Sequence, residues 1–187
     1  MIRWLLLILG GALLGGIVHL ATVIILPRTA TQDAYARLTP VVPVNTVVAL
    51  PLPTPEKAVM PFMDPAFATA VCRYDLSDGP LKLTVPVSPG YTSVSFYTRL
   101  DIAYYAINDR AAGRRVIELD LMTQAQHDQI PEDEEITAAD RLIVDSPTPT
   151  GIIAIRAMAA EPGLMPVAQS AVAAARCTRD TVPARGR

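Results

Sequence analysis

Two cysteines, Cys72 and Cys177, are the side chains with the clearest potential for chemistry, because the sequence holds no other thiol. In an oxidising compartment, two lone cysteines of a small domain are expected to form a disulfide. The alternative is that both are buried free thiols of a cytosolic domain. We expect the disulfide, and with it an extracytoplasmic position for the domain that carries these residues.

Catalytic and metal-binding patterns are sparse. His127 is the one histidine beyond the N-terminal apolar segment, and no Gly-x-Ser-x-Gly motif supplies a serine nucleophile for it. A single histidine without clustered cysteines does not make an ordinary zinc site. The run Asp75–Gly79 resembles half a calcium loop, but Val85 stands where such a loop needs an acidic side chain, so a turn is expected. We therefore predict no catalytic residue, cofactor or metal.

Four tyrosines in strand-like stretches are candidates for a binding groove. A phenol offers an apolar ring and a polar tip, and both suit contact with a ligand. The candidates are Tyr91, Tyr97, Tyr104 and Tyr105. The alternative is that these rings cap the edge of a hydrophobic core.

The charge of the chain argues against nucleic acid as a partner. The net charge is −2, and all 18 acidic side chains follow Arg28. Binding of nucleic acid needs clustered lysine and arginine, which the pair Arg114 and Arg115 does not provide. The expected partners are therefore the lipid bilayer and another envelope or membrane protein.

Residues 1–28 are predicted to form a transmembrane anchor. The 23 residues Trp4–Leu26 carry no charge, and a helix of that length spans about 35 Å, enough for a hydrocarbon core of about 30 Å. The residues just before Pro27 are bulky, whereas a signal-peptide cleavage site has small residues, which indicates an uncleaved anchor. The positive charges of the amino terminus and Arg3 favour a cytoplasmic N-terminal end, whereas the positive charge of Arg28 favours the opposite orientation. We expect the part of the chain that follows the anchor to lie outside the cytoplasm, in the periplasm of a Gram-negative host.

One side of this anchor has a small-residue pattern. Gly11 and Gly15 lie four residues apart, a spacing that lets helix backbones approach closely, and His19 and Thr22 continue the same side. The pattern predicts a helix–helix contact at Gly11, Gly15 and His19. The alternative is that the glycines have no partner and that His19 is simply neutral near the membrane centre.

Residues 29–63 are predicted to form a proline-rich spacer. Seven prolines between Pro40 and Pro65 exclude a helix. The segment is expected either to hold the domain away from the membrane or to lie along the domain as an edge strand, with Asn45–Leu50 as the strand candidate.

Residues 64–178 are predicted to form a β-rich domain, followed by a flexible tail at 179–187. Asp64 and Pro65 favour a helix start, and the spacing of apolar residues predicts a helix over Pro65–Tyr74. Strands are expected within 81–87, 93–97, 102–107, 114–121, 141–145 and 151–158. Thr123 and Gln126 predict a capping box, Glu132–Glu135 a solvated loop, and the alanine-rich run Pro162–Cys177 a C-terminal helix. The fold class is α+β: an N-terminal transmembrane helix, then an antiparallel sheet with flanking helices.

Four short runs resemble one bacterial family. They are Ala70–Leu76, Gly79–Pro80, Tyr91–Tyr97 and Ile107–Arg110, and they are similar to the family catalogued as domain of unknown function 1254, in its short membrane-anchored form from alphaproteobacteria. The likeness covers about residues 64–177. It implies an envelope location and a β-rich domain. It also implies a companion protein carrying domain of unknown function 1214, and it brings no catalytic residue.

The sequence thus predicts a non-enzymatic envelope protein, acting as an interaction module or as an accessory subunit of a membrane complex. The alternative is a periplasmic domain that binds a small molecule or a lipid through the tyrosine strands.

Overall fold

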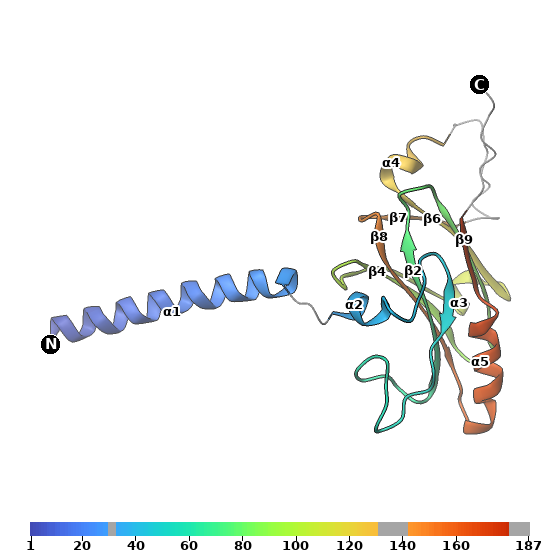
Figure 1. Ribbon diagram of the computed structural model, residues 1–187, viewed down its shortest axis with the longest axis horizontal. Coiled ribbons are helices and arrows are strands. Elements are labelled where there is room, and N and C mark those ends of the chain that lie inside the picture. Colours follow the sequence, from blue (N-terminus) through green and yellow to red (C-terminus); the bar gives the residue numbers. More distant parts are fainter. Residues whose placement is uncertain (30–32, 131–141, 180–187) are drawn as a thin grey trace. The chain divides into compact units, whose positions relative to one another are not determined.

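The computed structural model describes residues 1–29, 33–130 and 142–179 (Figure 1). The chain divides into two compact units, one ending at Asp33 and the other beginning at Ala34. The loop expected at Glu132–Glu135 and the tail beyond Arg179 lie outside the described residues.

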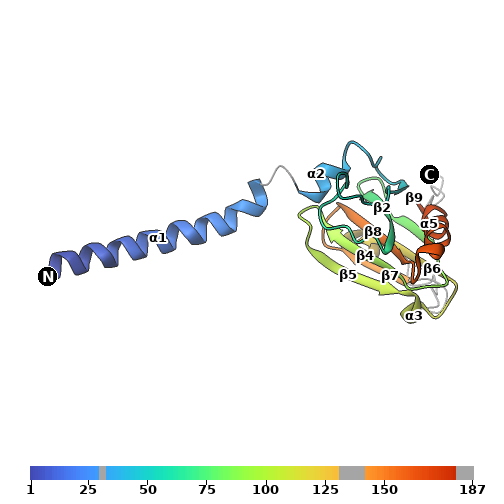
Figure 2. The same ribbon diagram turned by 90° about the horizontal axis from the view of Figure 1, so that it is seen from below.

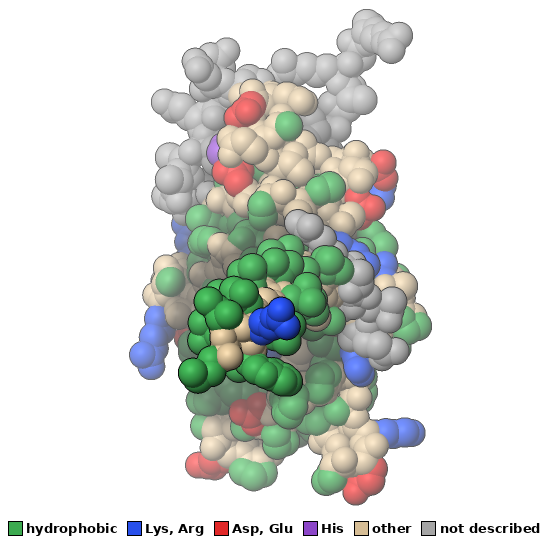
Figure 3. Space-filling model, turned by 90° about the vertical axis from the view of Figure 1, so that its left-hand side faces the viewer, with side chains coloured by type: hydrophobic (Ala, Val, Ile, Leu, Met, Phe, Trp, Pro, Cys, Tyr) green, Lys and Arg blue, Asp and Glu red, His purple; other side chains and the backbone are tan. Residues whose placement is uncertain are grey.

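The first unit is built on one long apolar helix, α1 (Ile2–Thr29). Its segment Ile2–Leu26 has a mean hydropathy of 2.2 and none of it is buried inside the protein. The end-on view in Figure 3 shows hydrophobic side chains covering its surface. By length and composition α1 can cross a membrane, a property that anchors share with signal sequences.

The second unit contains two β-sheets. A five-stranded antiparallel sheet has the order β1-β2-β8-β4-β5 (Val47–Ala49, Phe67–Asp75, Thr150–Met158, Thr92–Thr98 and Ala103–Asn108). A four-stranded sheet has the order β7-β6-β3-β9 (Leu142–Ser146, Val116–Thr123, Leu81–Pro86 and Arg176–Arg179). In the second sheet β6 and β7 are parallel and the other pairs are antiparallel. The α+β class is confirmed, with the strands divided between two sheets.

The main core lies between the two sheets. Strand β3 buries Leu81, Leu83 and Val85 and exposes the residues between them in part, which is the alternation of a strand with one covered face. On the other side β2 and β4 contribute Tyr74 and Phe96, both fully buried. Every second residue of these strands therefore points into one shared apolar layer.

Helix α5 (Met165–Ala173), which follows a 3-10 helix at Pro162–Leu164, completes the inner layer. It packs on β2 and β8, where the inward residues are the small Ala68, Ala70 and Ala157. These alanines leave room for the helix, and Ala168 and Val172 are buried there. Figures 1 and 2 show α5 at the side of the domain that faces away from α2 (Ala34–Leu38).

A disulfide between Cys72 and Cys177 links the two sheets. Cys72 lies on the inner face of β2, and Cys177 lies on the edge strand β9. Both are buried, and they are 105 residues apart in sequence. The cross-link therefore joins an early strand of one sheet to the last described strand of the other.

Of the two arrangements left open for the proline-rich segment, the structure contains the edge strand. Strand β1 pairs with β2 in antiparallel register, with Val47 opposite Cys72. Just before it, the side-chain amide of Asn45 accepts from the Asp75 backbone N–H and donates to the Asp75 carbonyl. Asn45 thereby extends the pairing of β1 by imitating a backbone amide.

The helix predicted over Pro65–Tyr74 is wrong, because this stretch is strand β2. The Asp64 carboxylate does accept a backbone N–H bond, but from Ala66, as in a short turn. Strand β2 is covered on both faces along most of its length, with Ala70–Tyr74 all buried. A strand buried on both sides has no polar alternation, so its apolar spacing imitated that of a helix.

The C-terminal helix is shorter than the predicted Pro162–Cys177. Helix α5 ends at Ala173, and the chain turns at Ala174 and Ala175 to enter β9. Cys177 thus lies on a strand and not at a helix end. The change of direction brings its sulfur to the inner face of β2, where Cys72 lies.

Candidate functional site

The outer face of the five-stranded sheet forms the floor of the candidate site. Alternate residues of β8 and β4 point away from the core: Ile152, Ala154 and Arg156 on β8, and Ser93, Ser95 and Tyr97 on β4. Register places Tyr97 beside Ile152 and Ser93 beside Arg156. The face thus changes from apolar at the Ile152 end to polar at the Arg156 end.

The segment between α1 and β2 covers part of this face. Leu38 of α2, Val42 and Leu50 are buried against Val71 and Ile152 of the sheet. Met60 and Met63, from the loop before β2, pack partly against the same cluster. This second apolar cluster exists because β2 and β8 present large side chains on the outer face as well as the inner one.

A groove of about 400 Å³ remains between the covering segment and the sheet. We call it the apolar lobe; its lining includes Leu38, Leu50, Met63, Val71 and Ile152. This volume falls within the range of about 300–1,000 Å³ typical of small-molecule sites. Phe62, in the same loop, is fully exposed at the rim and has a positive φ of 58°.

A shallower depression of about 320 Å³ adjoins the apolar lobe. This polar lobe is lined by Ser93, Ser95 and Asn108, with Tyr91 at its side. Phe67 and Arg156 line both lobes. The two depressions thus form one outer-face groove, with an arginine where they meet.

The charged groups of the groove are distributed unevenly. Asp64 and Asp101 line the apolar lobe, where each carboxylate accepts a backbone N–H bond, from Ala66 and Ala34 respectively. Within the part of the chain that the structure describes, no acidic residue lines the polar lobe. Among the described residues, no hydrogen bond or ion pair engages the exposed guanidinium of Arg156. The positive charge at the junction is therefore available to a bound group.

A buried arginine lies on β2 beside the floor of the groove. Arg73 of β2, paired with Ile152, is only 7% exposed, and its guanidinium lies 4.8 Å from the ring centre of Tyr35. Arg99 lies 4.2 Å from the same ring centre. Within the described structure the Nε and Nη1 atoms of Arg73 have no hydrogen-bond partner. Contact with the aromatic ring compensates part of the cost of burying this charge.

Three hydroxyl groups form a network inside the sandwich. The Tyr74 hydroxyl lies 3.0 Å from Ser146 Oγ and accepts from Tyr104 at 3.2 Å. Burial raises the pKa of the Tyr104 hydroxyl, and this effect outweighs its hydrogen bond to Ser146, which lowers the pKa. At Gly151 a side chain would collide with Tyr74 and with the Tyr97 carbonyl. The network is a packed core feature that supports the floor of the groove.

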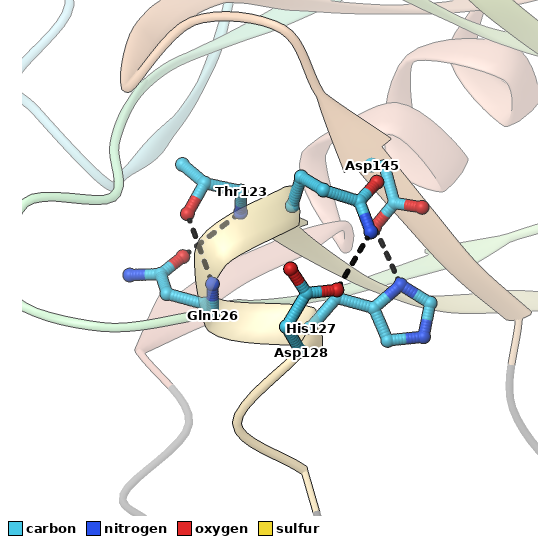
Figure 4. Close-up of polar contacts among 6 residues, drawn as sticks. Thr123, Gln126, His127, Asp128 and Asp145 are labelled. Carbon is cyan, nitrogen blue, oxygen red and sulfur yellow. Dashed lines mark hydrogen bonds and ion pairs between the residues drawn. The ribbon is translucent and has the colours of Figure 1, made fainter.

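His127 forms a pair with Asp145, with Nδ1 and Oδ1 2.9 Å apart and both side chains about 40% exposed (Figure 4). The capping box of Thr123 and Gln126, confirmed by reciprocal hydrogen bonds, begins the short helix α4 (Gln124–His127). The next residue after Asp145 is Ser146, whose hydroxyl points inward to Tyr74. This serine is therefore not placed to act as a nucleophile activated by His127.

The predicted turn at Asp75–Gly79 is present. The Ser77 N–H donates to Asp75 Oδ1 at 2.9 Å, and Gly79 has a φ of 137°. Hydrogen bonds from the Ser77 hydroxyl and amide lower the pKa of Asp75. Among the described residues, no cluster of three or more histidine, cysteine, aspartate or glutamate side chains could hold a metal.

The structure separates the four candidate tyrosines. Tyr97 lines the apolar lobe and Tyr91 the polar lobe, on the outer face. Tyr104 and Tyr105 both contact Phe96 and pack on the inner core; Tyr105 pairs with Phe96, and Tyr104 is the extra residue of a β-bulge, because Ala103 pairs with Tyr97. The glycine side of α1, with Gly11, Gly15 and His19, is exposed and belongs to the other unit.

The sequence pointed to only part of the groove: Tyr91 and Tyr97 were candidates for a binding groove, whereas its other lining residues were not. Ser93 and Ser95 lie within the predicted strand 93–97, but nothing in that pattern marks its outward side as the floor of a groove. Arg156 and Met63 lie far apart in the chain and meet only because β8 pairs between β2 and β4. The available signal for the groove was Arg156 itself, a charged residue at an alternating position of the otherwise apolar strand β8.

Comparison with known proteins identifies a family and a fold. The model of the family described as protein of unknown function (DUF1254) matches residues 44–179. A crystal structure of a protein from Vibrio parahaemolyticus matches with a TM-score of 0.57 at 14% identity, over 78% of this chain and 34% of that one. An uncharacterised protein from Burkholderia cenocepacia matches with a TM-score of 0.47 at 17% identity, over 68% of this chain and 34% of that one.

No curated protein matches the chain. The chain spans about a third of the length of both solved structures. At this level of identity, the likeness to the Vibrio structure shows the fold alone.

Proposed function

The chain belongs to the family of proteins of unknown function DUF1254, and on this premise we propose that it is a non-enzymatic, single-pass envelope protein. Helix α1 would lie in the inner membrane of a Gram-negative host, and the β-domain would lie in the periplasm. There the domain would serve as an interaction module or accessory subunit of a membrane complex.

The disulfide is the observation that carries the proposed location. Cys72 and Cys177 are bonded across the two sheets and are both buried. Disulfides persist in oxidising compartments and are rare in the cytosol. An apolar helix that can cross a membrane, followed by a disulfide-bonded domain, supports an anchored protein with its C-terminal domain outside the cytoplasm.

The proposed partner is a companion envelope protein. The chain corresponds to about a third of the Vibrio chain, so a separate polypeptide could supply what the rest of that longer chain contributes. The small-residue side of α1, with Gly11 and Gly15 exposed, supports a contact within the membrane.

The test is chemical crosslinking of the full-length protein in native membranes, followed by mass spectrometry. We expect one dominant crosslinked protein partner. If the contact depends on α1, this partner should be lost when detergent replaces the membrane before crosslinking. A chain carrying an unrelated single-pass helix in place of residues 1–29 is the matched control. Recovery of the chain without any dominant crosslinked protein would contradict the accessory-subunit proposal.

The outer-face groove favours a second candidate function, the binding of a small molecule or a lipid. Its apolar lobe of about 400 Å³ is partly enclosed by α2 and by the loop that carries Met60 and Met63. Methionine side chains are flexible and polarisable, so they adapt to ligands of different shape. Mass spectrometry of the intact protein released from native membranes would detect a retained small molecule as a fixed added mass.

A further inference from the structure

We propose that the outer-face groove binds a single acyl chain that ends in an anionic group, with the chain in the apolar lobe and the anion at Arg156. This proposal rests on the second candidate function, and it specifies the class of ligand. It follows from the order of side chains along the groove and from the distribution of charge.

The apolar lobe matches a hydrocarbon chain. Its floor is made by Val71, Ile152 and Ala154, and its cover by Leu38 and Met63. A hydrocarbon chain that leaves water for such a surface gains free energy in proportion to the apolar area buried. The two carboxylates in this lobe, Asp64 and Asp101, would repel an anion. The anionic end of the ligand is therefore assigned to the other lobe.

The polar lobe matches an anionic group. Arg156 lies where the lobes meet, and no described residue engages its guanidinium. Ser93 lies opposite Arg156 across β4 and β8, and Ser95 and Asn108 line the same lobe. A guanidinium with hydroxyl and amide donors around it suits a carboxylate or a phosphate. No acidic side chain of the described ranges lines this lobe to compete with the ligand.

The length of the connecting chain supports the membrane as the source of the ligand. Ala34 lines the apolar lobe and follows the last residue of α1, Thr29, by five residues. Five residues reach at most about 18 Å. If α1 spans the bilayer, this short connection joins the domain to an element in contact with membrane lipids, which include single-chain amphiphiles and phospholipids.

The test uses the full-length protein in its membranes and three photoreactive probes with the same clickable, diazirine-bearing C16 chain. The probes are the fatty acid, the corresponding fatty alcohol, and a lysophosphatidylglycerol whose one acyl chain is this chain. After irradiation, labelled peptides are identified by mass spectrometry. Labelling of α1 serves as the internal reference, because any lipid probe reaches a membrane helix.

We expect the fatty acid or the lysophosphatidylglycerol to label peptides from the loop around Met63 and from β8, and the alcohol to label them several-fold less. Stronger labelling by the fatty acid would identify a free acid as the source, and stronger labelling by the phospholipid would identify a headgroup lipid. Equal labelling by the alcohol would overturn the role of Arg156. Labelling confined to α1 would overturn the proposal as a whole.

Two variants locate the ligand. Ala154→Trp fills the floor of the apolar lobe, and Arg156→Glu reverses the charge at the junction; each is expected to reduce labelling by about tenfold relative to α1, the effect of losing one strong contact. Arg156→Lys should restore part of the signal. Ala111→Trp and Arg110→Glu, on the exposed helix α3 (Asp109–Ala112), are the matched controls and should label normally. Unchanged labelling in both groove variants would contradict the assignment.

A photocrosslinking amino acid at position 97 distinguishes an amphiphile in the groove from a polypeptide in the groove. Tyr97 lines the apolar lobe, so an amphiphile in the groove predicts no protein adduct at this position. A crosslinked polypeptide would overturn the proposal. Companion proteins are detected separately, by chemical crosslinking. The ligand proposal can therefore fail while the accessory-subunit proposal stands, and the reverse also holds.

Discussion

Asn45 performs a backbone role with its side chain. It has a φ of 56°, and its amide makes two hydrogen bonds with the Asp75 backbone, of 2.8 and 3.0 Å. Its own N–H donates to the Arg73 carbonyl. Asparagine tolerates the left-handed region better than other residues with a Cβ atom, so one residue supplies both the turn and the pairing.

Two substitutions at Asn45 separate these contributions. Asn45→Gly removes the side-chain bonds but keeps the backbone conformation, and should lower the free energy of unfolding by about 1–2 kcal/mol. Asn45→Ala adds the cost of the left-handed conformation, for a total of about 2–3 kcal/mol. Urea denaturation measures both. Equal losses in the two variants would show that the backbone conformation carries no cost.

Tyr104 predicts a loss of stability at alkaline pH. Burial raises the pKa of its hydroxyl in the folded protein, whereas an unfolded tyrosine titrates near pH 10. The folded state therefore holds its proton while the unfolded chain releases it, and the contribution to stability is complete below about pH 10 and falls as the pH rises above it. Tyr104→Phe should flatten this decline, measured by urea denaturation between pH 8 and 11. The same alkaline slope in both proteins would contradict the assignment to Tyr104.

At the scale of single elements, strands with one covered face could be predicted and strands with two covered faces could not. Leu81, Leu83 and Val85 alternate with polar residues, and β3 lies where the pattern placed it. Strand β2 is covered inside by the second sheet and α5, and outside by the α2 segment. This double burial removes the polar residues whose spacing would have identified a strand.

The groove was predictable only in part, for a related reason. Its floor comes from β2, β4 and β8, which lie far apart in sequence and become neighbours through the strand order. Local patterns identify the outward side of β4 but do not reveal which strand pairs beside it. The pairing of Cys72 with Cys177 was predictable because two cysteines allow one intramolecular bridge, and the structure confirms it.

The bridge between β2 and β9 should contribute strongly to stability. It closes a loop of 105 residues, and the chain-entropy model assigns about 4–5 kcal/mol to a closure of this length. Reduction of the purified full-length protein should lower the urea midpoint accordingly. The double variant Cys72→Ala/Cys177→Ala is the control and should be insensitive to reductant. An unchanged midpoint after complete reduction, verified by thiol counting, would show that the sheets do not depend on the link.

Helix α1 carries a separate prediction about its glycines. A Cβ at Gly11 or Gly15 meets no atom within 4 Å in the chain itself, so substitution should leave the isolated helix undisturbed. Gly11→Leu/Gly15→Leu should nevertheless abolish a helix–helix contact in the membrane, because bulky side chains keep the backbones apart. Co-purification or crosslinking of membrane partners is the measurement. Gly10→Leu/Gly16→Leu is the matched control, and equal partner recovery in both pairs would end the idea of a glycine interface.

At the scale of the whole molecule, an apolar helix without buried residues precedes a domain with its own core and a buried disulfide. The helix and the domain each require a particular environment. The helix surface needs a membrane or an apolar partner, because so large an exposed apolar surface is unfavourable in water. The disulfide needs an oxidising compartment. Together these requirements favour one topology, with the amino terminus in the cytoplasm and the domain outside.

That topology predicts the outcome of cleavage from outside the cell. A recognition sequence for a site-specific protease, inserted between Thr29 and Asp33, would separate the two units without relying on digestion of the folded sheets. Protease added to sealed spheroplasts should release the disulfide-bonded domain into the medium and leave α1 in the membrane. A cytosolic protein carrying the same sequence is the control and should stay intact until the membrane is permeabilised. If the domain remained cell-associated until permeabilisation, its cysteines would lie on the reducing side, and both the anchored orientation and the need for an oxidising compartment would be wrong.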